Sequence, residues 1–163
     1  MSIYSFCSKV GWLTLEEAGN ALTGVYFIKT SNAIFTENKL LLNAEKQISE
    51  YITGKRQHFH LPFKQEGTVF QKLVWNQLKK IPYGSTVTYK ELAIQLGKPS
   101  AARAVGSANN KNPLPIIIPC HRVIGQKQAL RGYSGGVKLQ RHLLELEKSD
   151  QAGILLFREN KKL

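Results

Sequence analysis

The chain has 163 residues, 42% of them hydrophobic, and a formal net charge of +12. This length fits one domain, or one domain with a smaller lobe, and the hydrophobic content can build an ordinary core, which excludes overall disorder. No apolar run approaches the roughly 20 residues of a membrane-spanning helix, and the N-terminus lacks a secretory signal pattern. We therefore expect a cytoplasmic protein without a membrane partner, or a nuclear one in a eukaryotic cell.

Basic charge is concentrated after residue 50. Residues 1–50 hold four Lys/Arg and five Asp/Glu, whereas residues 51–163 hold 19 and 6. This asymmetry indicates a polyanionic partner, because each phosphate that a protein neutralises releases counterions. A merely soluble basic surface would look the same, so charge alone leaves both interpretations open. The cations are scattered, which is less consistent with a basic membrane-surface helix.

The cysteine and histidine pattern does not indicate a metal site. Cys7 and Cys120 are too few for a disulfide framework, and the chain has no CxxC pair for zinc. His58 and His60 form an HxH pattern with no cysteine close by. We expect no bound metal.

The first part of the chain predicts a small lobe with a β-sheet and one helix. Three short runs rich in aromatic and β-branched residues, at 2–7, 11–17 and 22–30, are typical of strands, with a turn at Gly19–Asn20. A helix is expected from Lys39, because apolar residues recur on one face until Gly54 ends the pattern. We expect this α/β lobe, structural in role, at 1–64 and a second domain at 65–163.

The second domain is predicted to be mostly helical. Thr68 with Gln71 forms a capping-box pattern at the start of its first helix. The expected buried stripe of that helix consists of Val69, Leu73, Val74 and Leu78.

A helix-turn-helix is expected at about residues 88–110. Thr88 and Glu91 form a second capping box, Gly97 ends that helix, and Ser100 is placed to cap a third helix over 101–109. The third helix carries nearly all small side chains around Arg103. Close helix packing would explain this composition, and so would close approach to a nucleic acid.

An apolar stretch, residues 116–118, predicts a short buried strand that Pro119 ends directly before Cys120 and His121. A final helix is expected from Val137, followed by a short strand or tail at 153–163. The whole pattern predicts an α+β (mixed α/β) fold with a small N-terminal lobe.

Cys120 is a candidate nucleophile. A cysteine reacts only as its thiolate, so it needs a base, and His121 could serve if Pro119 breaks the strand geometry. A carboxylate normally orients such an imidazole, and Glu147 on the final helix is a candidate. Cys120 as an inert buried hydrophobe is the alternative.

The stretch IPCHRVIG at 118–125 resembles the active-site signature of the O6-alkylguanine-DNA alkyltransferase family. Flanking blocks in the same order and at similar spacing extend the resemblance over roughly residues 54–147. These blocks read GTVFQKLVWNQLKKIPYGSTVTYKELA, RAVGSANNKNP, GYSGG and LLELE. The first 50 residues resemble the family's variable N-terminal lobe only in outline.

The resemblance implies a catalytic group around Cys120 as acceptor nucleophile. His121 would activate the thiol through a water and Glu147 would orient the imidazole. Asn112 would tie the helix-turn-helix to the active-site strand by hydrogen bonds. Tyr89 would hydrogen-bond or protonate guanine N3 as the base departs, which makes the leaving group better.

The resemblance also implies a DNA-binding group. Arg103 would fill the space left by a flipped nucleotide while the helix around it lies in the minor groove. The small residues of that helix expected at the DNA are Ala102, Ala104 and Gly106. In the pocket, Ser134 would contact O6 with Tyr133 packed beside it. The main-chain carbonyls of Cys120 and Val123 would accept the exocyclic amine of guanine.

The implied reaction is the direct repair of O6-alkylguanine in double-stranded DNA, in which each chain acts once. O4-alkylthymine is a second possible substrate. The resemblance implies a monomer without a cofactor. The product thioether is not cleaved by water, so nothing regenerates Cys120. One departure from the family pattern is Gln140, where a lysine is usual. The alternatives are a non-catalytic alkyltransferase-like lesion binder, a cysteine hydrolase and a helix-turn-helix regulator.

Overall fold

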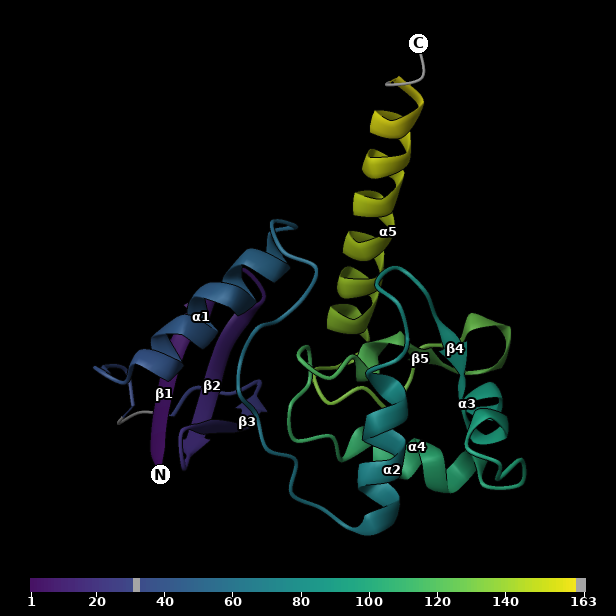
Figure 1. Cartoon of the computed structure of the whole chain (residues 1–163), viewed down its shortest axis with the longest axis horizontal. Coiled ribbons are helices and arrows are strands. Elements are labelled where there is room, and N and C mark those ends of the chain that lie inside the picture. The colour runs from purple at the N-terminus through teal and green to yellow at the C-terminus, as the bar shows by residue number, and fades with distance from the viewer. Residues whose placement is uncertain (31–32, 161–163) are drawn as a thin grey trace.

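The computed structural model describes residues 1–30 and 33–160, and it has the mixed α/β fold expected from the sequence. The N-terminal lobe holds β1 (Ser2–Ser8), β2 (Gly11–Ala18), β3 (Ala21–Tyr26) and α1 (Lys39–Ile52). The strands pair antiparallel in the order β1-β2-β3, as Figure 1 shows. The turn at Gly19–Asn20 is confirmed, with φ of 61° at both residues, as a type I′ hairpin turn requires.

Helix α1 packs its apolar face against this sheet (Figure 1). The Asn38 side chain caps its first turn by accepting from the Leu40 and Leu41 amides. Its buried face includes Leu41, Ile48 and Tyr51. The end of α1 is as predicted, because Gly54 follows the C-cap with a φ of 75°.

The C-terminal half is mostly helical. It contains α2 (Val69–Leu78), β4 (Val87–Thr88), α3 (Tyr89–Gln95), α4 (Ala102–Asn110), η1 (Cys120–Arg122), β5 (Val123–Ile124), η2 (Gln126–Gln128) and α5 (Val137–Asn160). Both predicted capping boxes, at Thr68 and Thr88, are present. Helices α3 and α4 form the expected helix-turn-helix and pack against each other, and α4 also packs against α2 (Figure 1).

Two helix details differ from the sequence prediction. Val69 and Leu73 are 89% and 42% exposed, and Trp75 joins the buried face of α2 instead. The reason is that the Trp75 indole N–H donates to the Ala108 carbonyl of α4 at 2.8 Å, which fixes the rotation of α2. The prediction that Ser100 caps the third helix is also wrong, because Ala101 is the N-cap and no side chain bonds there.

Residues 112–119 form a buried turn rather than the predicted strand. Asn112 holds the turn closed, because its Nδ2 donates to the Ile118 carbonyl at 2.9 Å and its Oδ1 accepts from the Leu114 amide at 3.0 Å. Ile116 has a φ of 74°, far from strand geometry. Three prolines in this stretch lack the N–H that a ladder needs. The strand near the active site is β5, which follows Cys120 and pairs parallel with β4.

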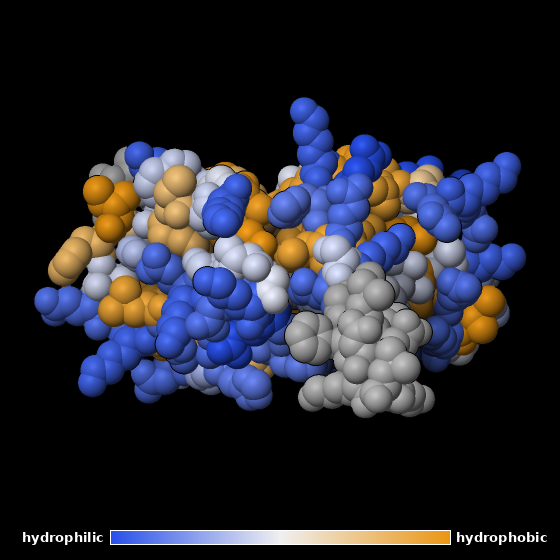
Figure 2. All heavy atoms as spheres, turned by 90° about the horizontal axis from the view of Figure 1, so that it is seen from above, coloured by the Kyte–Doolittle hydropathy of each residue, from blue (hydrophilic) through white to orange (hydrophobic). Residues whose placement is uncertain are grey.

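The predicted strand or tail after residue 152 is also wrong, because α5 continues through Asn160 and projects from the body in Figure 1. Residues 161–163 of that prediction lie outside the described residues. Figure 2 shows hydrophilic side chains over much of this face, with several groups of apolar atoms between them. Among the described helices, none is both long and apolar enough to cross a membrane.

The two halves share one hydrophobic core. Its members include Leu15 and Tyr51 from the first half and Trp75, Leu92 and Cys120 from the second. The Val25 amide of β3 donates to the Pro113 carbonyl at 2.9 Å, which ties the sheet to the 112–119 turn. The sheet therefore lies directly behind the segment that carries the candidate nucleophile.

Candidate active site

Cys120 begins the one-turn helix η1 directly after the 112–119 turn. Its side chain is almost fully buried, at 3% exposure. Burial raises the pKa of the Cys120 thiol to about 12, although nearby hydrogen-bond donors act the other way. At neutral pH the group is therefore a thiol, which needs a neighbouring base to react.

His121, the next residue in the chain, is a buried imidazole. Burial lowers the pKa of His121, despite its hydrogen bond with Glu147. Its Nε2 lies 2.7 Å from Glu147 Oε1, so the N–H is on Nε2, and its Nδ1 has no hydrogen-bond partner among the described residues. The lone pair that can take the thiol proton is therefore on Nδ1.

Glu147 on α5 is the centre of a buried charge cluster. Arg122 donates from Nε to both carboxylate oxygens at 3.1 and 3.0 Å, and from Nη2 at 2.9 Å. The Gly84 amide donates to Oε2 at 2.9 Å. Burial alone would raise the pKa of Glu147, but the hydrogen bonds from His121 and Arg122, together with the Arg122 charge, lower it to about 2. The ionised carboxylate can therefore stabilise an imidazolium.

Sequence reasoning assigned no role to two members of this cluster. Arg122 also donates to the Ile81 carbonyl at 2.7 Å, so its guanidinium is fixed while it neutralises Glu147. Its sequence signal was its place in the stretch IPCHRVIG, directly after Cys120 and His121. The other member is Tyr51 of α1, whose hydroxyl donates to Glu147 Oε1. Its only signal was a place on the apolar face of α1.

Acid should destabilise the fold through His121 and Glu147. Both have a folded-state pKa below the ordinary value, so their stabilisation is present above that value and is lost as pH falls. For His121 the loss starts below 6.5. For Glu147 it runs from 4.5 towards 2, and a shift of this size corresponds to about 3 kcal/mol. Urea unfolding between pH 8 and about 2 covers both windows, and a free energy of unfolding that stays flat would contradict the assignment.

Tyr89 lies at the start of α3, beside the 125–132 loop. Its hydroxyl donates to the Arg131 carbonyl at 3.1 Å. Burial raises the pKa of Tyr89, with a further contribution from Cys120. Gly132, with a φ of 74°, allows the 125–132 loop to turn beside the Tyr89 ring. The hydroxyl therefore remains protonated and can donate a proton or a hydrogen bond.

A groove beside Tyr89 separates α4 from the 125–132 loop. Most of the residues that line it are small or polar, and Lys90, Arg103 and Arg131 are its cations. Its lining includes Tyr89, Ala102, Arg103, Gly106, Ser107, Asn110, Gly125 and Gly132. Arg103 and Ala104 are exposed, whereas Val105 and Ala108 of the same helix are buried. One face of α4 therefore presents an exposed cation among small side chains.

The predicted pocket residues Tyr133 and Ser134 differ in burial. Tyr133 is buried and packs against His121, with ring centroids 6.3 Å apart. Its hydroxyl is buried and has no hydrogen-bond partner among the described residues. Ser134 is exposed. Tyr133 thus forms a wall beside the imidazole, and Ser134 lies at the surface.

Amide side chains hold the backbone around Cys120. Gln140 is buried, and its Nε2 donates to the His121 and Val123 carbonyls at 3.2 and 3.1 Å. Asn109 of α4, which sequence reasoning missed, donates from Nδ2 to the Cys120 carbonyl at 3.4 Å. The link from the helix-turn-helix to Cys120 therefore comes from Asn109, while Asn112 closes the turn. A neutral amide at Gln140 takes the place of the cation expected there.

Comparisons with known proteins identify the family. Residues 69–149 match the family model described as 6-O-methylguanine DNA methyltransferase, DNA binding domain. The methylated-DNA–protein-cysteine methyltransferase of Methanosarcina barkeri is 45% identical over 149 residues, which cover 88% of this chain and 94% of the relative. The constitutive enzyme of that name from Bacillus subtilis is 46% identical over 144 residues, 88% of this chain and 81% of the relative.

Solved structures agree with these sequence matches. A crystal structure of Mycobacterium tuberculosis OGT in complex with DNA has a TM-score of 0.84 and 41% identity, over 92% of this chain and 94% of that one. A further structure, the O6-methylguanine methyltransferase of the same organism, has a TM-score of 0.80 and 40% identity over 91% and 93%. The buried cysteine, imidazole and carboxylate lie within the matched region. This chain belongs to the methylated-DNA–protein-cysteine methyltransferase family.

Proposed function

We propose that this chain repairs O6-alkylguanine in double-stranded DNA by moving the alkyl group from O6 to Cys120. The observation that supports this most is a buried thiol beside a neutral imidazole whose Nε2 is held by an ionised carboxylate. In a duplex the lesion lies inside the base stack, so the nucleotide must be flipped out to reach a buried thiol. Family membership supports the same substrate.

The reaction is one displacement at carbon. The thiol proton moves to His121, through a water where the two groups are not in contact, and the thiolate sulfur forms a bond to the alkyl carbon. The bond from that carbon to O6 breaks, and its electron pair goes to the guanine. Tyr89 donates a hydrogen bond to guanine N3 or transfers its proton there. With the proton transferred, the base departs as neutral guanine, and Tyr89 regains a proton from solvent. Glu147 stabilises the imidazolium.

The product explains why each chain acts once. A thioether has no carbonyl for water to attack, so the alkyl group stays on the sulfur. The sulfur no longer carries the charge that makes a thiolate nucleophilic. We place the protein in the cytosol, or in the nucleus of a eukaryotic cell, acting as a monomer without a cofactor.

A labelled duplex tests this function against the alternatives. The protein is mixed with a duplex that carries one radiolabelled O6-methylguanine, and protein-bound and released label are followed over time. We expect the label to become bound to protein and to stay there. Continuous release of free label would indicate a hydrolase. Tight binding without transfer would indicate a lesion binder, and binding that depends on sequence rather than on the lesion would indicate a regulator.

If Arg103 acts as proposed, its loss should slow methyl transfer from duplex DNA but not from the free base. Arg103→Ala should lower transfer from a duplex at subsaturating DNA by about tenfold, because stabilising a flipped nucleotide and contacting phosphate each contribute a few kcal/mol at most. Transfer from the free O6-methylguanine base should be unchanged. Lys111→Ala, which removes an exposed cation at the other end of α4, is the matched control. An equal loss with duplex and free base would contradict the proposed role.

A further inference from the structure

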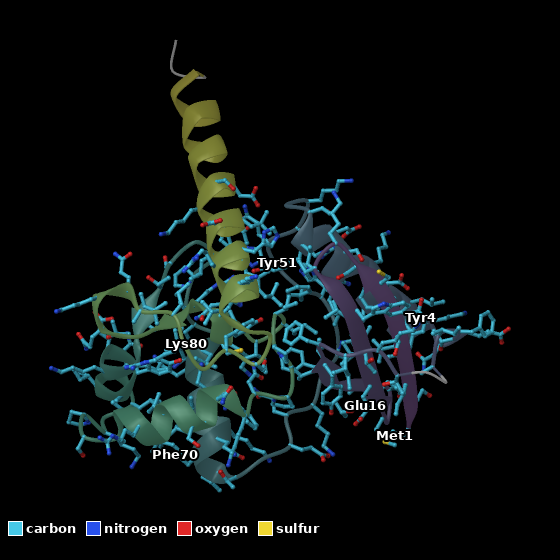
Figure 3. All side chains as sticks on the ribbon, turned by 180° about the vertical axis from the view of Figure 1, so that it is seen from behind. Met1, Tyr4, Glu16, Tyr51, Phe70 and Lys80 are labelled. Atoms are coloured by element: carbon cyan, nitrogen blue, oxygen red, sulfur yellow. The ribbon has the colours of Figure 1, made fainter. Side chains whose placement is uncertain are left out.

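The N-terminal lobe contributes one side chain to the buried cluster around Glu147. Tyr51 lies in the last turn of α1 and is 0% exposed. Figure 3 shows it between the N-terminal sheet and α5. Its hydroxyl donates to Glu147 Oε1 and lies 3.1 Å from His121 Nε2. Tyr51 is therefore in contact with both groups that act on the thiol.

The direction of each hydrogen bond follows from what each group can supply. A phenol has one proton to donate, and the ionised Glu147 takes it. Burial and then the charge of Glu147 raise the pKa of Tyr51, so the hydroxyl stays protonated. The lone pairs on its oxygen then face His121 Nε2. The Nε2–H is thus shared between Glu147 Oε1 at 2.7 Å and the Tyr51 oxygen at 3.1 Å.

Packing gives the Tyr51 ring little freedom to leave this position. Phe59 lies against it with ring centroids 5.3 Å apart, and Tyr83 meets it edge-on at 6.1 Å. The His121 ring is 6.3 Å away. These contacts come from the N-terminal lobe, the α2–β4 loop and the active-site segment, so the hydroxyl is held from three sides.

We propose that Tyr51 is a positioning residue by which the N-terminal lobe sets the reactivity of Cys120. It holds the imidazole in the tautomer with hydrogen on Nε2, which leaves Nδ1 to accept the thiol proton. It also fixes Glu147 Oε1 against His121. This inference rests on the methyl transfer proposed above, and it gives the N-terminal lobe a part in the reaction besides support.

Tyr51→Phe isolates the hydroxyl because the ring and its packing remain. At saturating duplex, the rate constant for methyl transfer per folded chain should fall about fivefold to tenfold, as expected for the loss of one hydrogen bond. The duplex concentration that gives half-maximal rate should not change. Tyr4→Phe is the matched control, because it removes a 2.8 Å hydrogen bond to Glu45 within the same lobe. That variant should react like the unmodified chain.

The tautomer of His121 can be measured directly, and it should not change if Tyr51 has only a structural role. The other histidines, His58, His60 and His142, are exposed and can be replaced by glutamine to leave one signal. In the unmodified ring, ¹⁵N NMR should show a protonated Nε2 and an unprotonated Nδ1. Tyr51→Phe should shift both nitrogens towards a mixture. An unchanged spectrum together with an unchanged rate would overturn the proposal.

One measurement needs no substitution at Tyr51. In the unmodified chain, its hydroxyl proton should give a slowly exchanging downfield signal with a nuclear Overhauser effect to the His121 ring protons. Absence of that contact would overturn the proposal even if Tyr51→Phe does not fold. These spectra are independent of methyl transfer. A chain with the predicted spectra but without transfer would contradict the proposed function and leave the Tyr51 contact established.

Discussion

Replacing Cys120 by alanine is expected to abolish methyl transfer while duplex affinity stays within about twofold. The Cys120 sulfur forms the new bond, and the two hydroxyls near His121, those of Tyr51 and Tyr133, stay protonated because burial raises their pKa. Cys120 is buried, so it makes no contribution to the exposed face of α4 that we propose binds DNA.

The measurement is labelled methyl transfer beside fluorescence anisotropy with the same duplex. Cys7→Ala is the matched control, because Cys7 is an exposed thiol on β1. It should transfer at the normal rate. Residual transfer by Cys120→Ala would mean that another residue accepts the methyl group. A large loss of affinity would mean that the thiol takes part in holding the DNA.

Glu147→Gln is expected to lower both the reaction rate and the stability of the fold. The transfer rate should fall at least about 100-fold, because an amide neither stabilises the imidazolium nor fixes the tautomer as a carboxylate does. The free energy of unfolding should fall by about 3–5 kcal/mol, because the buried Arg122 charge then has no anionic partner. Arg122 is 8% exposed, so water cannot compensate.

Single-turnover kinetics and urea unfolding measure the two effects separately. Glu145→Gln is the control, because Glu145 is exposed on the same helix. It should change neither quantity appreciably. If Glu147→Gln were less stable but reacted at the normal rate per folded molecule, Glu147 would be only a structural ion-pair partner.

Local signals predicted the elements that depend on local interactions. Thr68 and Thr88 predict the starts of α2 and α3, because each capping box lies within four residues of sequence. The type I′ turn at Gly19–Asn20 is equally local, since both residues tolerate a positive φ. Strand spacing in the first 26 residues follows from the runs that flank that turn.

The secondary-structure predictions failed where contacts between distant residues, or the missing N–H of proline, outweigh the hydrophobic pattern. Residues 116–118 have strand propensity, yet the prolines around them remove ladder donors and Asn112 closes a turn instead. In α2, the apolar pattern permits more than one buried face. A hydrogen bond from Trp75 to α4, 33 residues away, decides between them.

The residues of the candidate site also fall into two groups, those that a sequence motif identified and those that only the fold brings together. The sequence identified Cys120, His121 and Glu147 as candidates, and in the structure His121 and Glu147 are in contact. Tyr51, Arg122 and Asn109 received no role from sequence. Each acts through a contact whose partner is far along the chain, such as the 96 residues between Tyr51 and Glu147. One sequence without its fold contains no signal for such pairs.

The central claim is that one chain removes one methyl group and keeps it on Cys120. The most direct measurement incubates the protein with excess O6-methylguanine duplex, counts restored guanines per chain and maps the modified peptide by mass spectrometry. We expect restoration to stop at one guanine per chain, with S-methylcysteine at position 120. Continued restoration beyond one per chain, or a methyl group on any other residue, would contradict the account.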